Sequence, residues 1–206
     1  MLTLIIIAIT VVVSVLCFQS EDLFMRLRFS PYMVKHQNQT YRFFTNAFVH
    51  ADWMHLFVNM FVLYSFGTAV ESYFGILFAG KGVVYFIILY LGGILFSSLP
   101  AYGKHQSDPY YSAIGASGAV SAVLFSSILI QPWAGIGILF IPFHIPAFIF
   151  GPLYLIYEAY GSKKLNDNIG HDAHFWGAIF GIVITLIFDY RIGIGFIEQI
   201  KANLLM

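Results

Sequence analysis

Long apolar runs alternate with shorter polar segments along this chain, and six of the runs have the length of membrane-spanning helices. Because a helix rises about 1.5 Å per residue, roughly 20 apolar residues cross the hydrocarbon core of a bilayer. Continuous apolar runs favour helices over the alternating strands of a barrel. The pattern therefore predicts an all-α polytopic membrane protein, a single domain over residues 1–206 built as a bundle of six transmembrane helices. The predicted spans cover residues 2–18, 53–72, 82–99, 117–131, 145–160 and 174–190.

The first run, residues 2–18, also has the length of the apolar part of a signal peptide. No basic residue precedes this run, and no small-x-small cleavage site clearly follows it. We therefore predict a first span that is retained in the mature protein.

The segments between the runs differ in composition, and one of them decides the topology. Residues 19–52 mix aromatic and polar side chains, which is typical of an interfacial loop with short helices. Residues 103–115 and 161–172 are predicted to be polar loops. Four prolines interrupt residues 132–160, where we predict one span preceded by an apolar loop. Two spans there would reverse the direction of the last helix.

Polar residues stand at the starts of three runs, where a membrane span does not need them. His55 and Asn59 open the second run, Ser117 opens the fourth, and His174 opens the sixth. Successive spans alternate in direction, so all even-numbered helices enter from the same face. The sequence therefore predicts these side chains at similar depth on one side of the bundle.

Composition supports a membrane location and excludes other classes. Hydrophobic residues make up 59% of the chain and charged residues only 10%, against about 25% charged residues in soluble domains. The formal net charge is zero and no basic cluster occurs, so nothing indicates nucleic-acid binding. No internal repeat is evident and no charged residue is expected deep in a span, which argues against a channel or transporter. Cys17 is the only cysteine, so no internal disulfide forms.

Ser117 lies within the run Gly115-Ala116-Ser117-Gly118 at the start of the fourth predicted helix. Small neighbours leave its hydroxyl approachable, and the free N–H groups and positive dipole end of a helix start favour a developing oxyanion. A serine that only caps the helix beside packing glycines gives the same pattern. Ser117 is therefore a candidate nucleophile, with Gly115 and Gly118 as supporting residues.

His174 shares one face of the sixth predicted helix with Gly177 and Gly181, because the three follow i, i+3, i+7 spacing. The two glycines permit close contact with another helix. The fourth helix offers a matching small face that begins at Gly118, one position from Ser117. If the two faces meet, His174 can take the serine proton as general base and return it to the leaving amine. The alternative is a histidine that is hydrogen-bonded within a bundle core.

His55 and Asn59 are four residues apart and lie on one face of the second predicted helix. Both side chains can donate hydrogen bonds to an oxyanion. His50 precedes the helix and is expected to fix the loop, and Asp52 is a candidate N-cap.

A metal site is the main chemical alternative, because His50, His55, His171, Asp172 and His174 cluster near the same face. No H-E-x-x-H motif is present and the spacings do not match a zinc set, so we predict no metal. Asp172 is also poorly placed to orient His174, since the two residues are so close together at a helix start.

Together these motifs resemble the rhomboid family of intramembrane serine proteases. The resemblance rests on H-x4-H-x3-N ending at Asn59, G-x-S-G around Ser117 and A-H-x-x-G-x-x-x-G around His174, in this order. It covers a catalytic core of about residues 41–190. It extends to further positions, namely Tyr41, Arg42, Gly67, Glu71 and Gly75.

The resemblance implies a six-helix core in which Ser117 is the nucleophile and His174 is the base. It places the oxyanion hole at His55, Asn59 and the Ser117 backbone N–H, and it implies no cofactor. Family substrates are membrane proteins cleaved in or near a transmembrane segment, so transmembrane proteins and the lipid bilayer are the expected partners. An inactive relative that binds or escorts membrane proteins is the alternative, although such relatives usually lack the serine or the histidine.

Two features depart from the family pattern or from simple topology rules. Some members carry a tyrosine one turn after the serine, packed on the catalytic histidine, where this chain has Ser121, with Phe175 or Trp176 as candidate replacements. Basic residues are more numerous in the loops on the face of the predicted site, which favours a cytoplasmic site. The resemblance implies an extracytoplasmic site, which we follow, with a prokaryotic inner membrane as the expected location.

Overall fold

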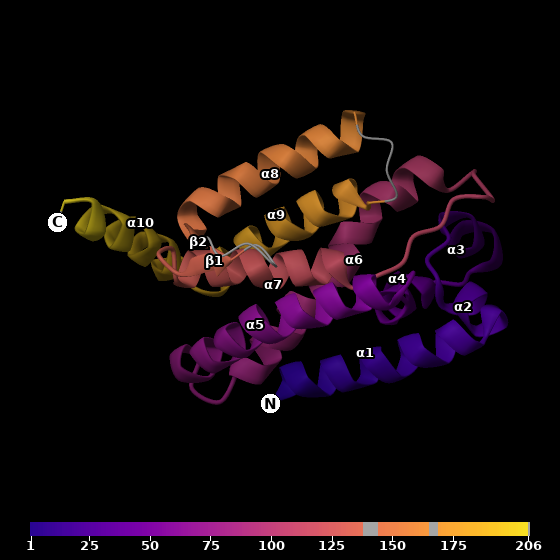
Figure 1. Cartoon of the computed structure of the whole chain (residues 1–206), viewed down its shortest axis with the longest axis horizontal. Coiled ribbons are helices and arrows are strands. Elements are labelled where there is room, and N and C mark those ends of the chain that lie inside the picture. The colour runs from indigo at the N-terminus through magenta and orange to yellow at the C-terminus, as the bar shows by residue number, and fades with distance from the viewer. Residues whose placement is uncertain (138–143, 165–168, 206) are drawn as a thin grey trace.

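The computed structural model describes residues 1–137, 144–164 and 169–205, and it is a helical bundle with one two-stranded hairpin (Figure 1). Most of the long helices run alongside one another, and the last helix extends from one end of the bundle. Along the chain the elements are α1 (Leu2–Gln19), α2 (Glu21–Leu27), α3 (Pro31–Gln37), α4 (Arg42–Thr45), η1 (Asn46–Phe48), α5 (Trp53–Leu77), α6 (Gly82–His105), α7 (Ser117–Ile130), β1 (Gly135–Gly137), β2 (His144–Pro146), α8 (Ala147–Lys164), α9 (His171–Phe188) and α10 (Arg191–Leu204).

Within the described residues, four helices have the length and apolar composition of a membrane span, namely α1, α5, α6 and α9. Helix α7, with 14 residues, is apolar but shorter. Helix α8 has 18 residues and carries Glu158, Lys163 and Lys164. The chain is thus a multi-pass membrane protein. Four of the six predicted spans thus coincide with helices long and apolar enough to cross a membrane, and the other two coincide with α7 and α8.

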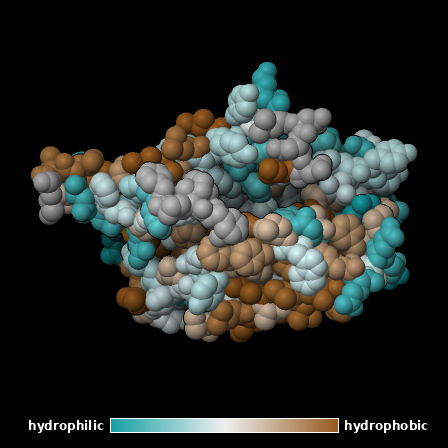
Figure 2. Space-filling view, in the orientation of Figure 1, coloured by the Kyte–Doolittle hydropathy of each residue, from teal (hydrophilic) through white to brown (hydrophobic). Residues whose placement is uncertain are grey.

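The surface of the bundle agrees with a membrane location. In Figure 2, hydrophobic side chains cover much of the lower face, over α1 and α5, and hydrophilic side chains gather toward the right-hand end, over α2 and α3. Exposed apolar side chains of α1 include Ile5, Ile9 and Val12. Such a broad apolar surface is compatible with lipid tails and unfavourable in water.

Two predicted polar loops are shorter than expected because the preceding helices continue into them. Helix α6 extends to His105, into the predicted loop 103–115, and basic side chains in its last turn favour the negative end of the helix dipole. Helix α8 extends to Lys164, into the predicted loop 161–172, of which residues 165–168 lie outside the described residues. Helix α10 follows the last predicted span and has no counterpart among the predicted elements.

The proline-rich stretch before α8 contains two strands: β1 lies in the predicted apolar loop, and β2 overlaps the start of the predicted span 145–160, so the helix begins at Ala147 rather than at residue 145. Strands β1 and β2 pair antiparallel, with Ile136 opposite Ile145. Strands of three residues are too short to give a periodic pattern in the sequence. The prediction for residues 138–143 lies outside the described residues. The described part of this stretch holds one helix, as predicted, and that helix contains Pro152.

Short helices build the segment between α1 and α5, as predicted. Ser20 and Ser30 cap α2 and α3, because each side chain accepts a hydrogen bond from a backbone N–H in the first turn. Arg42 is buried and donates hydrogen bonds to the carbonyl oxygens of Met25 and Arg28, at 2.9 and 2.7 Å. This arginine therefore ties α4 to the end of α2.

Helix α7 is the core of the bundle and is buried along almost its whole length. It packs against α5, α6 and α9. Small residues permit close packing: a Cβ on Gly93 of α6 would lie 2.9 Å from the Cβ of Ala122. The starts of α5, α7 and α9 all lie toward the right-hand end of the bundle in Figure 1. The helix starts that carry the predicted site are therefore at the same end.

Candidate active site

Glycines bring α7 and α9 into backbone contact near the starts of both helices. A Cβ on Gly177 would overlap the carbonyl oxygen of Gly118, and a Cβ on Gly118 would lie 3.3 Å from the carbonyl oxygen of Ala173. Deeper in the bundle, a Cβ on Gly181 would overlap the carbonyl oxygen of Ala122. The predicted contact between the small faces of these two helices is therefore confirmed.

Ser117 and His174 lie beside this contact, because Ser117 directly precedes Gly118 and His174 directly follows Ala173. Ser117 is the first residue of α7, is half-buried, and follows an N-cap residue whose side chain makes no capping hydrogen bond. The first N–H groups of α7 therefore lack a side-chain cap, and such groups suit an anion. His174 bonds to Glu158 rather than to the serine hydroxyl. Catalytic hydrogen bonds are often long in an enzyme without substrate.

The imidazole of His55 lies against the turn that precedes Ser117. Gly115 in this turn has a φ of 109°, a left-handed conformation that favours glycine, and its N–H donates to the carbonyl oxygen of Asn46 at 3.0 Å. A Cβ on Gly115 would lie 2.9 Å from His55 Nε2 and 3.9 Å from Ser117 Oγ. The glycine therefore leaves the space in which the ring and the hydroxyl approach each other.

Helix α5 holds His55 and Asn59 on one face, as their spacing predicts. Asp52 accepts a hydrogen bond from the His55 N–H at 2.7 Å, which confirms the predicted N-cap. The Ala51 N–H donates to His55 Nδ1 at 3.4 Å, so the proton of the neutral ring is on Nε2. Asn59 is buried and donates from Nδ2 to the His55 carbonyl oxygen at 2.9 Å, which uses one of its two N–H protons.

His50 is fully buried and links α1 to the start of α5. The Ser14 hydroxyl donates to the Phe48 carbonyl oxygen at 2.8 Å, so the Ser14 oxygen accepts from His50 Nδ1 at 2.9 Å. Burial, with a smaller contribution from the neighbouring His55, lowers the pKa of His50 to about 3. The neutral His50 ring packs edge-on against His55, with ring centroids 4.9 Å apart. His50 therefore supports the position of His55.

His174 is held by a buried carboxylate that the sequence reasoning missed. Glu158 on α8 has a side chain that is 3% exposed, and its Oε1 lies 3.1 Å from His174 Nδ1. Its Oε2 lies 2.6 Å from Nδ1 of His171, another buried side chain. Glu158 lies within the predicted span 145–160, near its end, and the sequence analysis did not include it among the candidate site residues. Phe175 and Trp176, the predicted supports of His174, pack on each other with ring centroids 5.5 Å apart.

Helix α8 also supplies the partner of Ser121, the position where some rhomboid proteins carry a tyrosine. The hydroxyl oxygens of Ser121 and Tyr154 are 2.9 Å apart. Tyr154 lies one helical turn before Glu158, so both polar side chains share one face of α8. A tyrosine and a glutamate at i, i+4 spacing inside an apolar run were the signals in the sequence for this arrangement.

The sequence of the chain matches a known protein family over most of its length. The rhomboid domain family matches residues 37–191, which include both α7 and α9. The chain belongs to the rhomboid family. This assignment confirms the resemblance that the sequence motifs indicate. The matched range also contains the helix starts that carry Ser117, His174 and His55.

Similar rhomboid proteins are known from organelles. RHOMBOID-like protein 12, mitochondrial, from Arabidopsis thaliana is 32% identical over 143 residues, which cover 65% of this chain and 42% of that protein. Presenilin-associated rhomboid-like protein, mitochondrial, from Homo sapiens is 29% identical over 139 residues, which cover 66% of this chain and 35% of that protein. Rhomboid-like protein 11, chloroplastic, from Arabidopsis thaliana is 29% identical over 170 residues, which cover 70% of this chain and 51% of that protein. The matches thus span between 35% and 51% of the length of these relatives.

The histidines that suggested a metal site in this rhomboid protein have hydrogen-bond partners within the chain. His50 bonds to Ser14, and His171 and His174 share the carboxylate of Glu158. Among the residues that the structure describes, no group of three or more His, Cys, Asp or Glu side chains could hold a metal ion. Each of these three rings thus has at least one hydrogen-bond partner within the protein.

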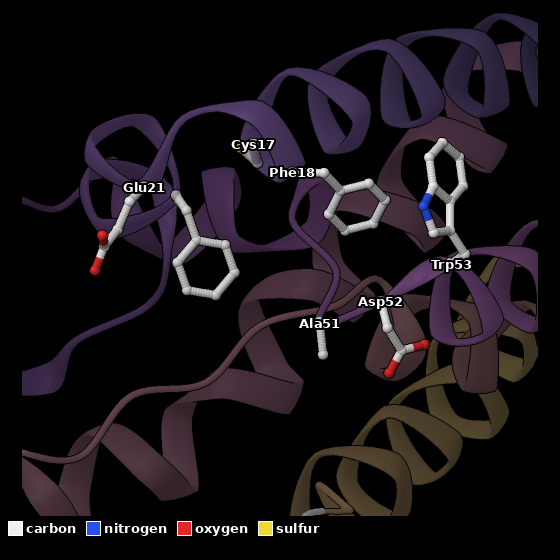
Figure 3. Close-up of a pocket in the computed structure, with 7 residues that line it drawn as sticks. Cys17, Phe18, Glu21, Ala51, Asp52 and Trp53 are labelled. Atoms are coloured by element: carbon white, nitrogen blue, oxygen red, sulfur yellow. The ribbon is translucent and has the colours of Figure 1, made fainter.

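A hollow of about 460 Å³ lies near the start of α5, on the side of α1 and α2 (Figure 3). Phe18 and Glu21 line it from the end of α1 and the start of α2, and Asp52 and Trp53 line it from the start of α5. None of the predicted catalytic or oxyanion residues belongs to its lining. The hollow therefore neighbours the candidate site without containing it.

Proposed function

We propose that this rhomboid protein is an intramembrane serine endopeptidase that cleaves transmembrane proteins in or near a membrane-spanning segment. One observation carries the proposal: the backbone contact between Gly118 and Gly177 holds Ser117 and His174 at the adjoining starts of two helices. A nucleophile and a base from different helices stay within reach only if the helices stay close. Glycines on both sides of the contact permit that closeness.

In this proposal His174 acts first as general base and then as general acid. Its Nδ1 is hydrogen-bonded to a carboxylate, so Nε2 is the nitrogen that takes the Ser117 proton. The serine oxygen attacks the scissile carbonyl, and His174 gives the proton to the leaving amine as the C–N bond breaks. A water molecule then attacks the acyl-serine ester and gives a proton to His174. The second product leaves as Ser117 regains its proton.

His55, Asn59 and the Ser117 backbone N–H form the proposed oxyanion hole. The proton on His55 Nε2 lies on the side of the ring that meets Gly115 and the serine hydroxyl. Asn59 has a second N–H proton besides the one that bonds to its own helix. Charge on the carbonyl oxygen develops only in the transition state, so these donors are expected to act on kcat rather than on substrate binding.

We also propose six spans, with α7 and α8 included, and a site on the extracytoplasmic side of a prokaryotic inner membrane. The family resemblance supports this orientation, whereas the count of basic residues opposes it. Arg42 contributes little to that count, because its guanidinium is buried and bonded to backbone carbonyls.

Two substitutions test the proposed function. Ser117→Ala and His174→Ala are each expected to lower cleavage of a single-span membrane protein in shared liposomes by roughly 10⁴-fold or more, with thermal unfolding unchanged. The exposed residues Ser65 and His36 provide matched controls, and Ser65→Ala and His36→Ala are expected to cleave like the wild type. A fluorophosphonate should label the wild type at Ser117. Full cleavage by Ser117→Ala would refute the mechanism, and a wild type that neither cleaves nor labels would favour an inactive relative.

A further inference from the structure

Glu158 is a buried group whose two carboxylate oxygens both have histidine partners. Oε1 lies 3.1 Å from His174 Nδ1 and Oε2 lies 2.6 Å from His171 Nδ1. A carboxylate in an apolar helix is costly unless its lone pairs are hydrogen-bonded. Packing of α8 against α9 alone would be served equally well by an apolar side chain. The arrangement therefore points to a role for the charge.

We propose that Glu158 is a positioning residue for the His174 base, an inference that rests on the proposed protease function. A carboxylate oxygen accepts only from a protonated Nδ1, so it selects the ring tautomer whose Nε2 lone pair can take the Ser117 proton. The same negative charge stabilises the imidazolium that forms after the proton transfer. In the proposed reaction Glu158 therefore acts on His174, and His174 acts on Ser117.

His171 fixes the orientation of the carboxylate from the first turn of α9. Gly161 on α8 makes room for its ring, since a Cβ there would lie 2.5 Å from His171 Nδ1. Tyr157 packs edge-on against the same ring, with centroids 5.4 Å apart. Because Oε2 is held by this confined ring, Oε1 is directed toward His174. His171 therefore acts on the base through Glu158.

In this arrangement the His174 ring is supported from α8, because α7 provides no aromatic side chain for it. Ser121, one turn after Ser117, has no ring to pack on His174, and its hydroxyl pairs with Tyr154 of α8. Glu158 follows Tyr154 by one turn and reaches α9. The same face of α8 thus contacts the helix of the nucleophile and the helix of the base.

Glu158→Gln tests the inference, because glutamine keeps the shape but offers one acceptor and one donor to two ring nitrogens. The substitution also removes the charge that faces the imidazolium. We expect kcat for cleavage of a reconstituted single-span membrane protein to fall about 10²–10⁴-fold, with KM changed less than about threefold. The rate at which a fluorophosphonate labels Ser117 should fall in parallel, since that reaction uses the same base.

Two variants act as controls for folding and for charge. Glu158→Asp keeps the charge on a shorter side chain and is expected to retain more activity than Glu158→Gln. Glu198→Gln makes the same chemical change at an exposed position of α10 and is expected to match the wild type. If Glu158→Gln does not fold, as judged by thermal unfolding in detergent, Glu158→Asp decides. Aspartate withdraws the carboxylate from His174, so a lower kcat at unchanged KM in that variant supports the positioning role, and a wild-type kcat overturns it.

The possible failures of the two proposals are distinguishable. Wild-type kcat in Glu158→Gln, or equal kcat in the Gln and Asp variants, would overturn the role of the Glu158 charge while Ser117→Ala stayed inactive. Cleavage by Ser117→Ala would instead refute the protease function itself, whatever the Glu158 variants do.

Discussion

Replacing Gly177 with alanine would add one methyl group where α7 and α9 touch. The added carbon would overlap the Gly118 carbonyl oxygen and would lie 2.8 Å from the Gly118 carbonyl carbon and 3.0 Å from its Cα, whereas ordinary contacts begin at 3.4 Å. All three atoms belong to the backbone, so no side-chain rotation relieves the overlap. The two helices must therefore move apart by at least several tenths of an ångström.

The expected effect of Gly177→Ala follows from that displacement. Overpacking of this kind costs about 1–3 kcal/mol of stability. A misplacement of about 1 Å in a catalytic arrangement costs about 10²-fold in rate. Because the shift separates Ser117 from His174, we expect kcat/KM to fall about 10–100-fold, together with a lower melting temperature.

The assay measures cleavage of a reconstituted single-span membrane protein and thermal unfolding of the same preparation. Gly75→Ala on α5 is the matched control, because no atom of a neighbouring element lies within 4 Å of a Cβ there. It should retain wild-type kcat/KM. If Gly177→Ala and Gly75→Ala were indistinguishable in activity and stability, the claim that backbone contact aligns Ser117 with His174 would be refuted.

Three further predictions concern the surroundings of the site. His55→Ala and Asn59→Ala should each lower kcat about 10²–10³-fold with little change in KM in the same cleavage assay, and an equal loss of substrate binding would contradict their oxyanion role. The free energy of unfolding should fall as the pH drops from 6.5 toward about 3, because unfolded His50 takes up a proton near pH 6.5 while the buried ring stays neutral. Thermal melts from about pH 7 to about pH 4 should therefore show a shallower decrease for His50→Asn, and equal slopes would contradict this. Tyr154→Phe should cost about 1–3 kcal/mol by leaving the Ser121 hydroxyl unpaired, and adding Ser121→Ala should recover most of that loss in thermal unfolding.

The positions of the long helices could be predicted because lipid demands continuous apolar runs. Helix ends were less accurate, since tertiary packing and the helix dipole let α6 continue to His105 through polar residues. The hairpin at Ile136 and Ile145 could not be predicted, because three residues give no periodic signal. The contact of Gly118 with Gly177 could be predicted, because small residues at helical spacing mark faces that pack closely.

The buried carboxylate shows where sequence reasoning about the site reached its limit. Local patterns relate residues three or four apart on one helix, whereas Glu158 and His174 are 16 residues apart and lie on different helices. Glu158 was visible as a single charge in the apolar run 145–160, yet only the packing of α8 on α9 pairs it with histidines. A charged residue within a predicted span is therefore expected to face the interior of the bundle and to pair with another polar side chain.

The length of α7 bears on how water takes part in the proposed reaction. With 14 residues α7 is about 21 Å long, whereas the hydrocarbon core of a bilayer is about 30 Å thick. Its neighbours α5 and α6 have 25 and 24 residues, so they continue past the level where α7 begins or ends. The residues that precede Ser117, 106–116, form a loop with polar groups instead of a further turn of helix. Lipid tails supply no water for hydrolysis of an acyl-serine ester, so in the proposed reaction we expect water to reach Ser117 from the polar loop at this end of the short helix.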